Sequence, residues 1–150
     1  MKHILHVILL VCLVMYLNSC KGNTGPVGPA GNANVQSMTI AQQTFTDDGL
    51  GGFQVALQTP MLTQAVLSSG AVLVYMQAIA VPGSWVALPT SVGGFNYNVV
   101  ISQGLVSVYV NQLPASAFNF RVVIIPKAAA IKSNPANYED VAKEFNLANN

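Results

Sequence analysis

The sequence predicts a mainly β domain, an antiparallel β-sandwich, with an open barrel as the alternative architecture. Three observations predict it: runs in which apolar and polar residues alternate, long apolar runs rich in β-branched residues, and glycine-rich turns between the runs. These features begin at Val35 and recur at short intervals. The chain has 150 residues, which is enough for one such domain.

Alternation marks several of the expected strands. Phe53, Val55 and Leu57 alternate with polar or small residues, as a half-buried strand requires. Gln103-Gly104 stands between two further alternating runs and predicts a β-hairpin. The expected strands are 53–58, 71–81, 85–88, 95–102, 106–111 and 118–125, with further turns at 49–52 and 93–94.

Two of these strands are largely apolar. Residues 71–81 lie between Gly70 and Pro82, which predicts a central strand. Arg121, the only arginine in the sequence, lies inside the apolar strand 118–125. We expect its side chain to point to the solvent face, where its aliphatic stem covers apolar surface.

Two short helices are expected besides the strands. The first lies near 60–69, with Thr59 as N-cap, Pro60 at the first helical position and Gly70 after its end. The second lies near 137–146, with Asn137 as N-cap.

The second helix has one apolar stripe, because Tyr138, Val141, Ala142 and Phe145 are spaced i, i+3, i+4 and i+7. A helix of this length is marginal alone in water. We expect it to dock on the sheet through Tyr138 and Phe145.

The first 19 residues predict a secretory signal peptide. Residues 1–3 carry positive charge, and the apolar run 4–17 is shorter than the roughly 20 residues of a membrane-spanning helix. Leu17-Asn18-Ser19-Cys20 resembles a bacterial lipobox. The resemblance implies that Cys20 carries diacylglycerol and becomes the first residue of the mature chain. An ordinary signal peptide and an uncleaved anchor helix are the alternatives.

Residues 20–34 form a predicted spacer between this anchor and the domain at 35–150. Glycine recurs at every third position, as in collagen, because only glycine fits at the axis of a triple helix. Four triplets are few for a triple helix, so we expect a monomeric spacer, with a local trimer as the alternative. The triplet glycines are Gly22, Gly25, Gly28 and Gly31.

Removal of the leader would leave few catalytic or metal-binding residues. The chain's histidines, His3 and His6, and one of its cysteines, Cys12, all precede Cys20. Ser-His-Asp catalysis, Cys-His catalysis and a Cys/His zinc site are therefore not expected, nor is an internal disulfide. We expect no cofactor and no metal.

The charges after the leader balance, five basic against five acidic side chains. Neither nucleic acid binding nor a polybasic membrane contact is expected, because both need clustered lysine and arginine. Membrane attachment would come from the acyl chains on Cys20.

A pair of carboxylates could still perform acid–base chemistry, as in glycosidases. Asp47-Asp48-Gly49 is typical of a turn, and it lacks the alternating acids of a calcium loop. Glu139 and Asp140 complement the dipole at the start of the second helix. The candidate acids are Asp47, Asp48, Glu139, Asp140 and Glu144.

Trp85 is the single candidate for a binding residue outside the acids. It is either a platform for a sugar ring or a protein partner, or a filler of the core or sheet edge.

These features together resemble the collagen-like-repeat lipoproteins of Bacteroidota. In that group a leader and "Cys-Lys" precede Gly-Pro-X triplets and a compact domain of about this size. The matching stretches here are 69–76 (SGAVLVYM), 85–89 (WVALP), 120–126 (FRVVIIP) and 137–146 (NYEDVAKEFN). The resemblance carries no known active site. Residues 21–24 lack the acidic export cue of some surface lipoproteins in this phylum, which leaves the surface and the periplasm both open.

The sequence therefore predicts a non-catalytic lipoprotein of the bacterial cell envelope, anchored in the outer membrane. Its β-sandwich would bind a protein or glycan partner, or serve envelope structure. A trimeric collagen-like stalk or adhesin and a carboxylate-dependent hydrolase are the alternatives.

Overall fold

The computed structural model describes residues 34–126 and 131–147; the leader, Cys20 and the triplets lie outside this part. The strands are β1 (Gln36–Gln43), β2 (Thr46–Asp47), β3 (Phe53–Gln58), β4 (Ala71–Ala78), β5 (Val86–Leu88), β6 (Thr90–Val92), β7 (Phe95–Ser102), β8 (Leu105–Val110) and β9 (Phe118–Ile125). The helices are α2 (Gln64–Ser69) and α3 (Tyr138–Phe145).

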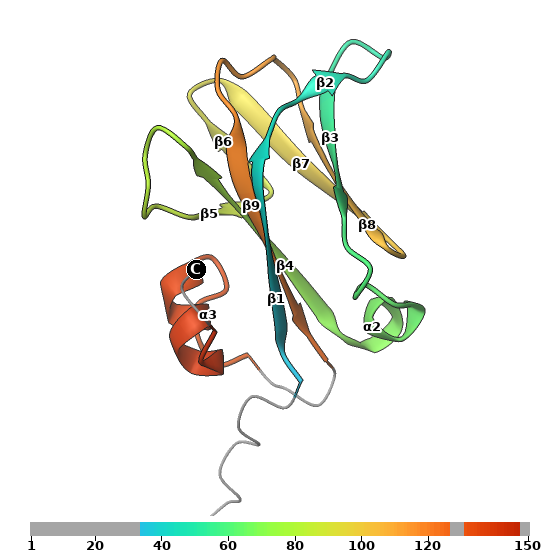
Figure 1. Cartoon of the computed structure of the whole chain (residues 1–150), viewed down its shortest axis with the longest axis vertical. Coiled ribbons are helices and arrows are strands. Elements are labelled where there is room, and N and C mark those ends of the chain that lie inside the picture. The colour runs from blue at the N-terminus through green and yellow to red at the C-terminus, as the bar shows by residue number, and fades with distance from the viewer. Residues whose placement is uncertain (1–33, 127–130, 148–150) are drawn as a thin grey trace, which may run out of the picture.

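The strands form two antiparallel sheets that are not closed into a barrel (Figure 1). Sheet A has the order β1-β9-β4-β5, and sheet B has the order β2-β3-β8-β7-β6. The predicted antiparallel sandwich is thereby confirmed. The chain changes sheet at Pro89, between the edge strands β5 and β6.

The main core lies between the two sheets. On β8, Val106, Val108 and Val110 are buried, and each is followed by a less buried residue, as the alternation predicted. Val122 and Phe120 of β9 face them from the other sheet, and both are fully buried.

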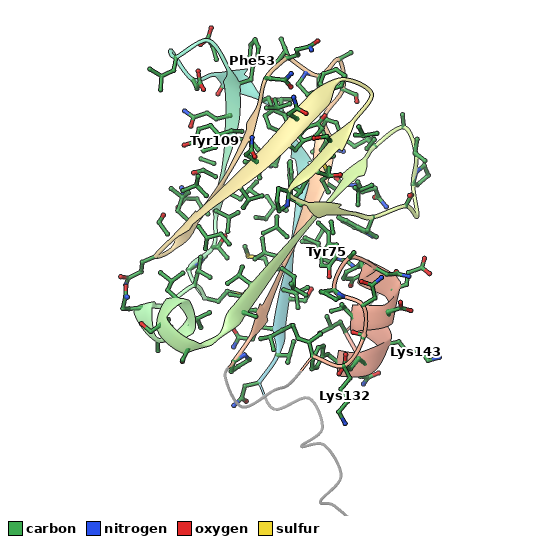
Figure 2. The ribbon with its side chains drawn as sticks, turned by 180° about the vertical axis from the view of Figure 1, so that it is seen from behind. Phe53, Tyr75, Tyr109, Lys132 and Lys143 are labelled. Atoms are coloured by element: carbon green, nitrogen blue, oxygen red, sulfur yellow. The ribbon has the colours of Figure 1, made fainter. Side chains whose placement is uncertain are left out.

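A second apolar cluster lies on the outer face of sheet A, where α3 covers it. The buried stripe of α3 packs against Tyr75, Val123 and Ile125. Figure 2, seen from behind, shows Tyr75 beside this helix. The helix therefore adds a third layer over part of the sandwich, and its predicted stripe and Asn137 N-cap are both confirmed.

The hairpin at Gln103-Gly104 is also confirmed, because Ser102 pairs with Leu105 across it. Gly104 has a φ of 75°, which favours glycine in this tight turn.

The first helix begins later than predicted. Thr59 is not its N-cap: its backbone N–H donates to the carbonyl of Gly104, and its hydroxyl donates to the carbonyl of Leu57. Thr63 caps α2 instead, accepting from the N–H of Val66. Gly70 ends the helix as expected.

The central strand is shorter than predicted. β4 ends at Ala78, where its partner β9 begins at Phe118. The chain then turns, and the N–H of Val81 donates to the carbonyl of Ala78. The strand expected at 85–88 begins at Val86.

Candidate functional site

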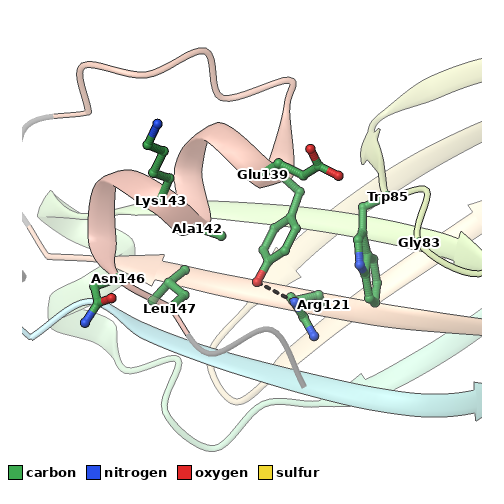
Figure 3. A pocket seen from close by; sticks show the side chains of 9 residues that line it. Gly83, Trp85, Arg121, Glu139, Ala142, Lys143, Asn146 and Leu147 are labelled. Atoms are coloured by element: carbon green, nitrogen blue, oxygen red, sulfur yellow. Dashed lines mark hydrogen bonds between the residues drawn. The ribbon is translucent and has the colours of Figure 1, made fainter.

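A hollow of about 590 Å³ lies between α3 and the segment that leads into β5 (Figure 3). β9 contributes Arg121 to it, α3 contributes Tyr138, and the segment before β5 contributes Trp85. Its lining is completed by Gly83, Glu139, Ala142, Lys143, Asn146 and Leu147.

Arg121 is buried, with 2% of its surface exposed, so the prediction that it faces solvent is wrong. Its direction follows from the strand: Phe120 and Val122 point into the main core, and Arg121 therefore points outward from sheet A. The outward face at this point is covered by α3 and by Trp85. A side chain pointing away from the core is thus buried by a third layer.

The guanidinium of Arg121 is held by hydrogen bonds and by aromatic rings. Its Nε donates to Thr39 Oγ1 at 2.9 Å, and one terminal nitrogen donates to the hydroxyl of Tyr138. Its central carbon lies 4.6 Å from the ring centroids of both Trp85 and Tyr138. Cation–π attraction strengthens when the cation is desolvated, so these contacts offset part of the cost of burying the charge.

The ring of Tyr75 packs against the ring of Tyr138. Their ring centroids are 5.1 Å apart in an edge-to-face arrangement, and the hydroxyl of Tyr75 donates to the carbonyl of Pro135 at 2.7 Å. Burial, with a smaller contribution from Tyr138, raises the pKa of Tyr75 from 10.0 to about 12. Tyr75 is therefore a neutral hydrogen-bond donor that joins the sheet to the segment before α3.

The rim of the hollow combines both signs of charge with an aromatic side chain. Glu139, Lys143 and Asn146 are exposed, while Trp85 is half-buried. A smaller hollow of about 270 Å³ lies alongside and is lined by Ser84, Asn137 and Trp85 among others. This arrangement suits recognition of a polar ligand against an aromatic edge, because orientation in such sites comes from a few polar groups beside apolar surface.

The predicted acids do not gather at the hollow. Asp48 closes the loop between β2 and β3, where its Oδ1 accepts from the N–H groups of Leu50 and Gly52. Asp47 accepts from the N–H of Gly49 at 2.7 Å, which confirms the turn. Glu139 is on α3, which lies apart from that loop (Figure 1).

Glu144 and Asp140 also belong to α3. The carboxylate of Glu144 accepts from the backbone N–H groups of Lys132 and Ser133. Hydrogen bonding to Ser133 chiefly, and to Lys132, lowers the pKa of Glu144. Asp140 is exposed in the first turn, where it complements the helix dipole.

Cys20 and the triplet glycines Gly22, Gly25, Gly28 and Gly31 lie outside the described residues. Among the residues that the structure describes, no three acids, histidines or cysteines are grouped as metal ligands. In that same part of the chain, no helix is long and apolar enough to cross a membrane.

The chain matches no protein-family model, no curated protein and no solved structure. The site is therefore described by its own residues alone. Sequence reasoning singled out Trp85 but missed Tyr138 and Arg121 as its neighbours. The one signal in the sequence was a single arginine inside an apolar strand. The segments that bury it are distant in sequence, so the local pattern does not identify them.

Proposed function

We propose that the protein is a non-catalytic, lipid-anchored component of the bacterial cell envelope whose β-sandwich binds a macromolecular partner. The anchor is the acylated Cys20, and residues 20–34 are the spacer between it and the domain. The outer membrane is the proposed site of attachment.

The hollow beside Trp85 is the observation that carries the binding role. It is wide, it has an aromatic edge, and Glu139, Lys143 and Asn146 on its rim are exposed. Arg121 beneath them contacts Thr39, Tyr138 and Trp85, so its charge serves to fix the floor of the hollow. A rigid floor with a polar rim supports recognition.

Lipid attachment is tested by growing the expressing bacterium with an alkyne analogue of palmitate. We expect label on the wild-type protein in the membrane fraction, and loss of the label in Cys20→Ala. Cys12→Ala is the matched control, because this cysteine lies in the leader and should not be acylated. Label retained in Cys20→Ala, or a wild-type protein without label, would refute the anchor.

The exposed side of the membrane is tested with a tag after Asn150 and protease treatment of intact and lysed cells. Cleavage in intact cells would indicate surface display and a partner outside the cell. Protection until lysis would indicate a periplasmic domain and a partner within the envelope.

A further inference from the structure

The outer face of sheet B carries an ordered set of side chains. Paired residues on antiparallel strands point to the same face, so the register aligns Thr46, Gln54, Tyr109 and Asn98 in one row across four strands. Figure 2 shows Tyr109 on this sheet, far from Lys132 and Lys143 at the α3 end. At roughly 4.8 Å between neighbouring strands, the row extends over about 14 Å.

The described residues on this face are all uncharged, and we call it the neutral face. Because Val55, Leu57, Val106, Val108 and Tyr97 point into the core, their neighbours along the strands point outward. The neutral face consists of Thr46, Gln54, Ala56, Gln58, Ser91, Asn96, Asn98, Val100, Ser102, Leu105, Ser107 and Tyr109.

Three of the four polar side chains of the central row have no partner among the described residues, whereas the Thr46 hydroxyl donates to the carbonyl of Gln54 at 3.4 Å. The side chains of Gln54, Tyr109 and Asn98 make no hydrogen bond to any other residue that the structure describes. The outer face of sheet A differs, because its polar side chains bond to each other and to the backbone. There Asn119 donates to Gln77 at 3.2 Å and accepts from the N–H of Gln42 at 3.0 Å.

We propose that the neutral face binds a chain of an uncharged polysaccharide, laid across the strands along the row centred on Tyr109. Amide and hydroxyl groups on both sides of a half-buried phenol ring can donate to and accept from sugar hydroxyls. The ring itself offers an apolar, electron-rich face to the C–H groups of a sugar. This face is on sheet B and is distinct from the hollow beside Trp85, so the inference depends neither on that hollow nor on the lipid anchor.

Because the neutral face carries no charged residue in the described chain, it favours an uncharged ligand over an anionic one. An anionic polymer needs lysine or arginine, but the cations of the described chain, Arg121, Lys132 and Lys143, lie on or beside α3. The buried core of a protein–protein interface is more apolar than the surface around it, and Val100 is the one large hydrophobic residue of this face that is more than half exposed in the described structure. Neutral polymers with many hydroxyl groups match what the face offers.

The test is affinity electrophoresis of the full chain in detergent, through gels that contain a neutral polysaccharide. The probes are hydroxyethyl cellulose, pullulan and galactomannan, with carboxymethyl cellulose as the anionic counterpart of the first. We expect at least one neutral polymer to retard the protein and carboxymethyl cellulose to leave its mobility unchanged.

Three variants locate the binding. Tyr109→Ala and the double variant Gln54→Ala, Asn98→Ala should each weaken the retardation about tenfold or more, the equivalent of about 1.4 kcal/mol. Gln64→Ala, an exposed glutamine on α2, is the control and should bind as wild type. Circular dichroism establishes that each variant is folded, and Tyr109→Phe provides a milder change should Tyr109→Ala unfold.

Retardation by a neutral polymer that is lost in the row variants and kept in Gln64→Ala supports the proposal. No retardation in any neutral gel overturns it, as does equal retardation by carboxymethyl cellulose. Self-association that Tyr109→Ala abolishes would also overturn it, by assigning the face to a second copy. A negative result in the electrophoresis would not affect the palmitate labelling, so polysaccharide binding and the lipid anchor are tested independently.

Discussion

At the residue scale, the buried guanidinium of Arg121 makes each of its contacts costly to lose. Tyr138 serves it twice, because its hydroxyl accepts a hydrogen bond and its ring lies against the cation. Tyr138→Phe removes the first contact and keeps the second. Hydrogen bonds to charged groups contribute about 1.5 to 3 kcal/mol, so we expect a loss of that size in the free energy of unfolding.

Urea unfolding of the chain from Lys21 onward measures this loss. Tyr109→Phe is the matched control, because its hydroxyl makes no hydrogen bond to a described residue. It should change stability by about 0.5 kcal/mol or less. Equal effects of the two substitutions would contradict the importance of the Arg121 contact.

Tyr75 gives the protein a defined response to alkaline pH. Its pKa is 10.0 in an unfolded chain and about 12 in the fold, chiefly because burial disfavours the phenolate. The raised pKa means that its contribution to stability is fully present below pH 10 and is lost as the pH rises through 12.

Urea midpoints measured from below pH 10 to pH 12 test this response. We expect the wild type to lose more stability over this window than Tyr75→Phe, which has no proton to release at this position. Parallel curves for the two proteins would refute the assignment. Comparison with the variant also removes the contribution of Tyr97, whose pKa burial raises as well.

The sequence-based expectation for Arg121 was right about the side of the sheet and wrong about exposure, because the side chain is covered. Arg121 points away from the core, as expected, because successive side chains of a strand point to opposite faces and Phe120 and Val122 point into the core. The cover comes from Trp85 and Tyr138, which are distant in sequence. Burial by distant segments leaves no trace in the pattern of a single strand.

At the scale of elements, the end of α2 is fixed by a close approach between backbones. A Cβ on Gly70 would lie 2.8 Å from the carbonyl oxygen of Ile125 and 3.0 Å from that of Val66. Since both atoms belong to the backbone, they cannot move aside cheaply. We expect Gly70→Ala to lower the free energy of unfolding by about 1 to 3 kcal/mol, the range for overpacking.

Thermal unfolding compares this variant with Ser68→Ala on the exposed side of the same helix. Ser68→Ala should cost about 0.5 kcal/mol or less. A Gly70→Ala protein as stable as wild type would show that β9 and α2 are not held this closely.

The two helices show why one boundary was predictable and the other was not. Asn137 caps α3 through its own side chain, which accepts from the N–H of Glu139. Such a cap depends on residues two positions apart. Thr59 is instead tied to the β7–β8 hairpin, since its N–H donates to the carbonyl of Gly104, a distant residue. Local signals placed α3 correctly, whereas this long-range contact of Thr59 could not be read from the local pattern.

The cap on α3 has a measurable value. Asn137→Ala removes the acceptor for the N–H of Glu139, and loss of such a cap costs about 1 kcal/mol. Asn98→Ala, which removes an amide without a partner among the described residues, is the control and should be nearly neutral. Equal urea midpoints for Asn137→Ala and wild type would contradict the cap.

At the scale of the whole molecule, the sequence predicted the class of fold but not the order of its strands. Alternation identifies a strand, yet pairing of β1 with β9 depends on segments far apart in the chain. The two- and three-residue strands β2 and β6 are too short to show a period. The buried apolar residues of the described chain form two clusters, one between the sheets and one beneath α3.

These two clusters bear on the oligomeric state. The helix α3 covers apolar surface on sheet A that a partner chain would otherwise have to cover. The outer face of sheet A is covered by α3, and the neutral face of sheet B is polar. Four triplets are also few for a triple helix. We therefore expect the chain from Lys21 to Asn150 to sediment as a monomer.

Sedimentation at several protein concentrations tests this expectation, with a Gly25→Ala, Gly28→Ala double variant beside the wild type. A triple helix tolerates no other residue at its axis, so these changes would dissociate a trimer held by the triplets. We expect both proteins to be monomers with equal mass. A wild-type trimer that the double variant dissociates would establish the collagen-like stalk, and a trimer that survives would assign the interface to the sandwich.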